Sequence, residues 1–252
     1  MATANLDHAA LVADLVEAVD VTDRWSRMTK HLAAIGMDQI NYGILDTVAA
    51  ARIDAPVRFL STMASGWIDY YGDRRLDLSD PHVLFVRNGN RLPYRWGESV
   101  LRQLDESSAR ETVGLTVEAG LRSQLSVPML DSFGGTMPVA GMTLGSSLAE
   151  GEYFRAIDGR ESELVMIAQL FHLYSIGEVR REFYGIAKLS SRERDCLSYL
   201  AQGLRIDAIA DRLCLARVTI ELHLRRARKK LHAATLPEAV ARALLFQEIT
   251  IG

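Results

Sequence analysis

The residues best suited to holding a small polar ligand lie in the stretch GWIDYYGDRRLDLSDP, which runs from Gly66 to Pro81. Trp67 and Tyr71 are four positions apart, so on a helix they face the same side, and the carboxylate of Asp80 follows. An indole N–H and a phenol O–H donate hydrogen bonds, whereas a carboxylate accepts them. Two interpretations are open from these residues alone: polar groups around a ligand, or core aromatic side chains followed by a helix that Asp80 caps.

Sequence motifs of enzymes and metal centres are missing. The chain has no glycine-rich phosphate loop and no HExxH, GxSxG or CxxC pattern, and its 6 histidines are scattered. Cys196 and Cys214 are the only cysteines, and they lack the spacing of metal ligands. We therefore expect no catalytic residue, no metal site and no cofactor. Hydrolysis of an amide or lactone at Asp80 is a third hypothesis, weakened because a single carboxylate lacks the partner that nucleophilic catalysis needs.

The composition is that of a globular protein and favours the cytoplasm. Of the 252 residues, 48% are hydrophobic and 24% are charged, and no apolar run is long enough to predict a membrane span. The N-terminus does not resemble a signal peptide. Residues 186–252 hold 12 Lys and Arg against 7 Asp and Glu, a balance of +5, while the rest of the chain has a balance of −8. This basic C-terminal part suggests nucleic acid as a partner.

Hydrophobic periodicity predicts both helices and strands in the first 180 residues. The expected helices span residues 6–19, 22–35, 106–119 and 161–180, another helix opens at Pro81, and the expected strands span residues 39–45, 57–63, 125–130 and 138–146. Gly134 and Gly135 predict a hairpin turn between the last two strands. We therefore expect an α+β fold whose N-terminal part is an α/β/α sandwich around an antiparallel sheet.

Residues 189–252 have the pattern of a small helical domain with a basic face. Ser190 and Glu193 form a capping-box signature, and Gly203 is a natural stop for the helix that they begin. Apolar stripes predict two further helices around a tight turn at residues 214–216, and Pro237 opens a fourth. A short helix, a tight turn and a basic helix describe a helix-turn-helix, although a plain helical bundle with a solvated basic face has the same composition.

This C-terminal segment resembles the DNA-binding domain of the LuxR family of bacterial regulators over about 45 residues. The matching residues are Leu189, Ser190, Arg192, Glu193, Leu197, Ala201, Gly203, Ile209, Ala210, Leu213, Thr219, Ile220, His223, Leu224, Lys230 and Leu231. The resemblance implies that Glu221 and Arg225 face base edges. It also implies that Arg217, Thr219 and His223 lie near phosphates, and Arg226 adds to the exposed basic face that would neutralise them.

Two positions depart from the pattern of that family. Ala216 stands where a serine usually caps the recognition helix, so the cap is lost or is supplied by another group. Glu221 stands where a basic or polar residue is usual. Its carboxylate accepts a hydrogen bond from the N4 amine of cytosine, or it pairs with Arg225 four residues later, and both alternatives are open.

The N-terminal part resembles the autoinducer-binding domain of LuxR-type quorum-sensing regulators, through the pattern Trp-x3-Tyr-x8-Asp-Pro followed by Pro-x2-Trp. Those receptors bind N-acyl-homoserine lactones. The resemblance implies that Trp67 donates to the lactone carbonyl, that Tyr71 donates to the acyl carbonyl and that Asp80 accepts from the amide N–H. It further implies that Trp96 packs beside the head group and that the hydroxyl of Thr143 reaches the amide region.

Three features of this second resemblance depart from the family. Trp96 lies one residue farther from Asp80 than usual, Gln124 replaces a glycine, and Met63 occupies a position often held by tyrosine. These changes leave the head-group contacts untouched and alter residues that shape the acyl channel.

We interpret the chain as a LuxR-type quorum-sensing transcriptional regulator that acts as a homodimer. Residues 1–180 are the expected autoinducer-binding domain, residues 181–188 a linker, and residues 189–252 a helix-turn-helix domain of four helices. The expected partners are an N-acyl-homoserine lactone and double-stranded operator DNA, with no membrane. The alternative is an orphan regulator of this type that answers a different small molecule or binds DNA without a ligand.

Overall fold

The structure is a computed structural model that describes residues 7–45, 58–130 and 138–250. The chain forms two compact units, Met1–Leu173 and Tyr174–Gly252, and each has its own hydrophobic core. The turn predicted at Gly134 and Gly135 lies outside the described residues.

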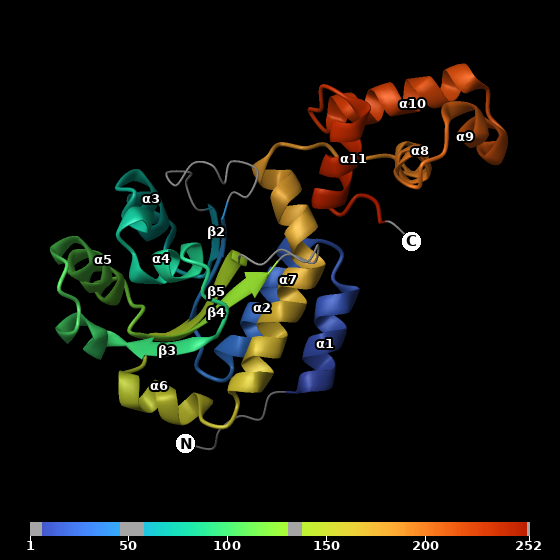
Figure 1. Ribbon diagram of the computed structural model, residues 1–252. Helices are drawn as coiled ribbons and strands as arrows, with labels where there is room; N and C mark the ends of the chain where they lie inside the picture. The colour runs from blue at the N-terminus through green and yellow to red at the C-terminus, as the bar shows by residue number, and fades with distance from the viewer. Residues whose placement is uncertain (1–6, 46–57, 131–137, 251–252) are drawn as a thin grey trace. The chain divides into compact units, whose positions relative to one another are not determined.

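Within the described residues, a five-stranded antiparallel sheet forms the centre of the N-terminal unit (Figure 1). Its strands are β1 (Gln39–Ile44), β2 (Arg58–Ser61), β3 (Tyr94–Gly97), β4 (Ser123–Leu130) and β5 (Pro138–Ser146). They lie in the order β2-β1-β5-β4-β3, and every neighbouring pair is antiparallel. The predicted α+β fold is confirmed. The sequence predicts four of these strands but not β3, because four residues are too few to establish a period.

Helices cover both faces of this sheet (Figure 1). They are α1 (His8–Glu17), α2 (Val21–Ala33), α3 (Ser65–Asp73), α4 (Pro81–Arg87), α5 (Ser107–Glu118), α6 (Glu150–Ile157) and α7 (Glu161–Phe183), with 3-10 turns at Leu76–Leu78 and Glu98–Arg102. In Figure 1, α1, α2 and α7 lie on one side of the sheet and α3, α4 and α5 on the other, so the sheet is the middle layer of a sandwich. The sequence does not predict α6, because eight residues are too few for periodicity to identify.

Aromatic side chains join the sheet to two helices on its first face. Tyr42 of β1 is fully buried, and its ring meets Phe171 of α7 edge-on at 5.2 Å between centroids. Phe171 in turn meets Trp25 of α2 at 5.5 Å. Each such pair is worth about 0.5–1.5 kcal/mol beyond the area that it buries. These contacts therefore fix the positions of α2 and α7 on the sheet.

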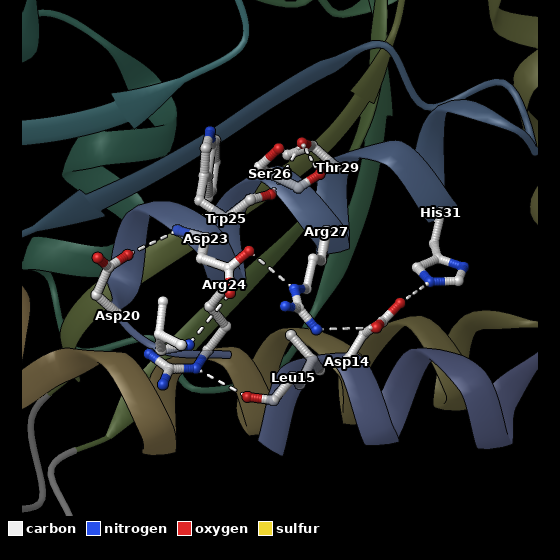
Figure 2. Close-up of polar contacts among 11 residues, drawn as sticks. Asp14, Leu15, Asp20, Asp23, Arg24, Trp25, Ser26, Arg27, Thr29 and His31 are labelled. Atoms are coloured by element: carbon white, nitrogen blue, oxygen red, sulfur yellow. Dashed lines mark hydrogen bonds and ion pairs between the residues drawn. The ribbon is translucent and has the colours of Figure 1, made fainter. Parts of the chain in front are cut away.

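Polar side chains fasten α1 to α2 (Figure 2). Asp14 of α1 lies 2.7 Å from Nε2 of His31 and accepts from Nη1 of Arg27 at 3.2 Å, both on α2. Arg24 is buried and donates from Nε to the backbone oxygen of Leu15 at 2.9 Å. A buried guanidinium is tolerated where its donors find acceptors. The pairing of the two N-terminal helices is thus specified by charge as well as by apolar contact.

Glycines on β5 let other elements approach the second face of the sheet closely. At Gly141, an added Cβ would lie 3.2 Å from Cγ2 of Val86, so the absence of a side chain lets α4 approach the strand. The space at Gly145 is tighter, because a Cβ there would lie 2.6 Å from the backbone oxygen of Gln39 and closer still to Cδ1 of Leu121. Glycine is required at this central position by close packing on both sides.

The C-terminal unit contains the end of α7 and a group of short helices around an apolar core. The helices are α8 (Ser191–Ala201), α9 (Ile206–Leu213), α10 (Arg217–Lys230) and α11 (Leu236–Leu245). Leu197, Ile209, Ile220 and Leu224 are buried at the centre. Cys214 has the left-handed value φ 53 between α9 and α10, which makes the tight turn predicted there. The predicted helix-turn-helix architecture is confirmed.

The helix α7 passes through the predicted domain boundary. It continues to Phe183, so the first three residues of the predicted linker, residues 181–188, are helical. The division between the two compact units falls between Leu173 and Tyr174, also within α7. The boundaries at residues 180 and 189 stay predictions.

The predicted capping box of α8 is present and is tied to α10. The backbone N–H of Ser190 donates to Oε2 of Glu193 at 2.8 Å, and the backbone N–H of Glu193 donates to Oγ of Ser190 at 3.3 Å. Glu193 also accepts from Nζ of Lys230 at 2.7 Å, although its side chain is only 4% exposed. Burial opposes ionisation of Glu193, but Lys230 and the Ser190 N–H outweigh it and lower the pKa of the carboxyl.

The substitution Glu193→Gln is expected to lower the free energy of unfolding by about 1–2 kcal/mol at neutral pH, because glutamine keeps the capping box but leaves Lys230 without its anion. The pKa of Glu193 is depressed in the folded chain, so this stabilisation is present above the unfolded value of about 4.3 and is lost as the pH falls through the folded pKa. Urea unfolding at several pH values measures it. A difference between the two proteins that persists unchanged in acid would contradict this origin.

Candidate functional site

A cavity of about 70 Å³ in the N-terminal unit brings together most of the predicted ligand residues. It is lined by Asn41, Phe59, Met63, Trp67, Ile68, Tyr71, Asp80, His82, Val83, Thr116, Leu121, Gln124 and Thr143. Six of the seven predicted residues are therefore on its wall, and they come from α3, β4, β5 and the loops before α3 and α4. The seventh, Trp96, does not line it.

Asp80 caps a helix and faces the cavity with the same carboxylate. Its Oδ1 accepts from the backbone N–H of His82 at 2.8 Å, which confirms the predicted N-cap of α4. Its Oδ2 accepts from the phenol of Tyr71 at 2.6 Å. Burial raises the pKa of Asp80, while the hydrogen bonds from Tyr71 and from the backbone of His82 and Val83 act in the opposite direction. The carboxylate is thus a buried acceptor with lone pairs to spare.

Trp67 and Tyr71 lie together on α3, as their spacing predicts. Their rings are 6.0 Å apart, and Phe59 of β2 meets Tyr71 edge-on at 5.5 Å. Burial, followed by the charge of Asp80, raises the pKa of Tyr71 well above its usual value. The phenol therefore keeps its proton and remains a donor at the wall of the cavity.

Trp96 contacts a histidine instead of the cavity. Its ring stacks on the imidazole of His82 at 3.7 Å between centroids and 10° between planes. Trp96 is buried, and its indole N–H has no hydrogen-bond partner within the described part of the chain. With Phe85, Ser99 and Glu150 among others, it lines a separate cavity of about 420 Å³.

His82 is a cavity residue that the sequence does not single out. Besides stacking on Trp96, it is hydrogen-bonded through Nδ1 to the phenol oxygen of Tyr94. Burial lowers the pKa of His82 well below its usual value, so the imidazole is neutral. The only sequence feature that could have indicated His82 is its place directly after Asp80 and Pro81. A single histidine without a second residue at metal-ligand spacing does not match a known motif.

A smaller apolar cavity adjoins the first. Its volume is about 60 Å³, and it shares Asn41, Phe59, His82, Val83 and Thr143 with the larger one. Its remaining walls are Gly43, Leu45, Val86, Ser126, Val127, Gly141 and Met142. The cavity that holds Asp80 and Tyr71 thus continues into one with Val86, Val127 and Met142 on its wall, which suits an amphiphilic ligand.

Metal binding and membrane insertion find no support in the described structure. Across residues 7–45, 58–130 and 138–250, no three His, Cys, Asp or Glu side chains come close enough to hold a metal ion. Over the same ranges, no helix has the length and apolar character needed to span a bilayer.

The predicted DNA-contacting residues all lie on α10, the helix after the tight turn. They are Arg217, Thr219, Glu221, His223, Arg225 and Arg226. Arg225 and Arg226 are exposed, and neither has an ion-pair partner among the described residues. The N-cap residue Ala216 makes no side-chain hydrogen bond, so its departure from the family pattern does remove a cap.

Arg217 is held by two carboxylates. Its Nη1 donates to both oxygens of Asp207 on α9, at 2.8 and 2.9 Å, and its Nε donates to Glu221 at 3.0 Å. These hydrogen bonds, first that of Glu221, raise the pKa of Arg217. Glu221 therefore pairs with the arginine four residues before it. The alternative that pairs Glu221 with Arg225 is wrong, because the Glu221 carboxylate accepts from Arg217 instead.

The substitution Asp207→Asn is expected to raise affinity for nonspecific duplex DNA about twofold to fivefold at low salt, since exposed ion pairs are weak and Arg217 becomes available to phosphate. Asp211→Asn is the matched control, because Asp211 is exposed on the same helix and has no ion-pair partner in the described part of the chain. Fluorescence anisotropy across a salt series measures both. Equal gains in the two variants would show that net charge alone is responsible.

Two family comparisons cover both compact units. Residues 20–175 match the family described as autoinducer binding domain, and residues 187–243 match the family described as bacterial regulatory proteins, luxR family. Among similar proteins, the transcriptional activator BjaR1 of Bradyrhizobium diazoefficiens is 26% identical over 185 residues, 71% of each chain. The transcriptional activator RaiR of Rhizobium etli is 29% identical over 211 residues, 79% of this chain and 80% of that protein.

Solved structures share the architecture at low identity. SdiA of Escherichia coli has a TM-score of 0.57 at 17% identity and covers 96% of this chain and 98% of its own. CepR2 of Burkholderia cenocepacia has a TM-score of 0.55 at 14% identity, with 70% of this chain and 99% of its own. These likenesses establish the fold. Since the autoinducer family matches more than half of the sequence, the chain is a transcriptional regulator rather than an enzyme and belongs to the LuxR family, with an autoinducer-binding domain before a helix-turn-helix DNA-binding domain.

Proposed function

We propose that this regulator binds an N-acyl-homoserine lactone in the cavity of its N-terminal unit and binds operator DNA as a homodimer through α10. The observation that carries the proposal is the buried pair of Tyr71 and Asp80 on the wall of that cavity. Burying a carboxylate costs free energy unless it receives hydrogen bonds, and charge-assisted bonds from a ligand are among the strongest available.

The head-group roles follow from the donors and acceptors on the cavity wall. The phenol of Tyr71 has a single O–H, which donates a hydrogen bond to Asp80 in the structure. When the amide N–H of a ligand takes that place on Asp80, the Tyr71 O–H can donate to the acyl carbonyl instead. Trp67 then donates to the lactone carbonyl, and Thr143 lies near the amide. Binding exchanges one hydrogen bond for several, which favours the correct ligand.

The acyl chain would occupy the adjoining apolar cavity. The two cavities, about 70 and 60 Å³, are smaller than the ≈ 300–1,000 Å³ of pockets that enclose drug-sized ligands. Ligand uptake must therefore move lining side chains, and the flexible thioethers of Met63 and Met142 are suited to this. Binding in this proposal stabilises an expanded conformation and shifts the population of the chain toward it.

The DNA-binding half of the proposal uses the exposed face of α10. Arg225 and Arg226 are exposed cations there, suited to a base edge and to phosphate respectively. A dimer would place two copies of α10 on a pseudo-palindromic site. Domain boundaries at residues 1–180, 181–188 and 189–252 and a cytoplasmic location belong to the same proposal.

A second candidate is an orphan regulator that answers another small amphiphile or binds DNA without a ligand. Gln124, a buried amide on the cavity wall, favours it because the family has glycine there. One solved structure of SdiA is a complex with octanoyl-rac-glycerol, so that protein accepts a glyceride.

Native mass spectrometry of the full chain expressed with a mixture of acyl-homoserine lactones tests the proposal. We expect one bound lactone per protomer, released with its mass unchanged, and operator affinity in gel shifts that depends on it. Cooperative folding and ligand-independent DNA binding with an empty pocket would favour the second candidate. A hydrolysed lactone would overturn both.

A further inference from the structure

Five side chains form a polar cluster on one face of the β3–β4 ladder. Trp96 lies directly opposite Gln124, and Tyr94 lies directly opposite Ser126, so all four point to the same face. The imidazole of His82 stacks on Trp96 at 3.7 Å and lies nearly parallel to Tyr94 at 5.7 Å. We call these five residues the β3–β4 cluster.

Four members of the β3–β4 cluster form two hydrogen-bonded pairs. Nε2 of Gln124 donates to Oγ of Ser126 at 3.0 Å. The phenol oxygen of Tyr94 is hydrogen-bonded to Nδ1 of His82. Because Tyr94 and Ser126 lie directly opposite each other, the two pairs are neighbours on this face of the ladder.

One atom at the outer end of each pair has no partner in the described structure. These two ends, Nε2 of His82 and Oε1 of Gln124, are inaccessible to solvent and have no hydrogen bond within the described residues. Both residues line the 70 Å³ cavity that holds Asp80. Buried polar atoms are normally paired, so unpaired atoms on two residues of one cavity wall point to partners on a ligand.

The two ends are of opposite kind. Gln124 donates its amide N–H to Ser126, so its Oε1 is an acceptor. Nδ1 of His82 is the acceptor that the phenol proton of Tyr94 reaches in the described structure, so the neutral imidazole has its N–H at Nε2 and is a donor there. The two residues thus offer one donor and one acceptor.

We propose that His82 and Gln124 select an acyl-homoserine lactone that carries a hydroxyl group on its acyl chain close to the amide. A hydroxyl donates and accepts, so it satisfies both ends. A keto group satisfies only the donor, and a methylene group satisfies neither. Gln124 is opposite the tryptophan on which His82 stacks, so both residues lie on the same face of the ladder. This proposal rests on the lactone function proposed above.

Isothermal titration of the full chain with three lactones of equal length tests the selection. The probes are octanoyl-, 3-oxo-octanoyl- and 3-hydroxyoctanoyl-homoserine lactone. We expect the hydroxyl compound to bind about tenfold more tightly than the unsubstituted one, with the keto compound between them, because buried groups left unpaired penalise the wrong ligand.

Substitutions in the β3–β4 cluster test whether it causes the preference for the hydroxyl compound. His82→Phe keeps a ring on Trp96, and Gln124→Met keeps the bulk of the amide side chain. In each, we expect the three affinities to converge to within about threefold. Ser126→Ala removes the acceptor that orients the Gln124 amide and should reduce the preference in the same way. Gln39→Met is the matched control: Oε1 of Gln39 is also buried and unpartnered, but Gln39 lines neither adjoining cavity, so the preference should stay.

The outcomes separate this inference from the function on which it rests. If the wild-type chain binds all three lactones equally, or the keto compound most tightly, the selection is wrong while the lactone function stands. If it binds none of them, the lactone function fails and this inference with it. A preference that survives in His82→Phe, Gln124→Met and Ser126→Ala, all confirmed folded by thermal melts, would also overturn it.

Discussion

Asparagine in place of Asp80 is expected to weaken lactone binding about tenfold to a hundredfold and to leave the ligand-free chain as stable as before. Asparagine is as good an N-cap as aspartate, so its oxygen can still accept from the His82 N–H. Its amide group then presents N–H to the cavity, where the ligand also presents N–H. Two donors face each other, and the charge-assisted bond is lost. Titration calorimetry gives the affinity, and thermal melting gives the stability.

The pH dependence of binding provides an independent check on Asp80. Burial raises the pKa of its carboxyl in the folded chain, so the buried charge lowers stability as the pH rises from the unfolded pKa through the folded one. A ligand N–H favours the charged form. Lactone affinity should therefore fall as the pH drops through the raised pKa, and the slope should vanish in Asp80→Asn. Unaltered affinity in this variant, at any pH, would remove Asp80 from the site.

Alanine in place of Gly145 is expected to destabilise the N-terminal unit by about 3 kcal/mol, the upper part of the range for overpacking. The new Cβ would lie 2.6 Å from the backbone oxygen of Gln39 on the neighbouring strand. Because β5 is the central strand, the clash cannot be relieved by moving an edge. The same methyl group would press on Leu121, which lines the cavity, so ligand binding should weaken as well. Urea unfolding with a fixed slope measures the change in stability.

Gly114→Ala is the matched control for Gly145→Ala. Gly114 lies in the middle of α5, and no atom is found within 4 Å of its added Cβ. Alanine there should stabilise the chain by roughly 0.5–1 kcal/mol through helix propensity. The same chemical change thus has opposite signs at the two positions. Destabilisation of similar size at both would mean that close packing at β5 is not the cause.

Long elements with caps were predictable from the sequence, while short ones were not. The capping box of Ser190 and Glu193, the stop at Gly203 and the tight turn at residues 214–216 are local signals, and all three are present. The strand β3 and the helix α6 carry no such signal, because four and eight residues give too few repeats of either period. They are specified by neighbours distant in the sequence.

The site shows the same division between local and distant information. Spacing alone placed Trp67 and Tyr71 on one side of a helix, and Asp80 followed by proline identified a helix start. The stacking of His82 on Trp96 could not be foreseen, because it depends on the register of β3 against β4. The pairing of Glu221 with Arg225 was one of two open alternatives, and Glu221 accepts from Arg217 instead. Asp207 on another helix helps to hold Arg217 in place, and an argument from α10 alone cannot include it.

The two carboxylate oxygens of Asp80 have different roles: one caps helix α4, and the other accepts from Tyr71 at the cavity. A library of all substitutions at this position would therefore give two different profiles. Selection for abundance alone should accept asparagine, serine and threonine, since each can begin a helix. Selection for a transcriptional response to ligand should accept aspartate alone. The same two selections can be applied to every position on the cavity wall. The positions where the two profiles differ would then identify the ligand pocket without any ligand having been identified in advance.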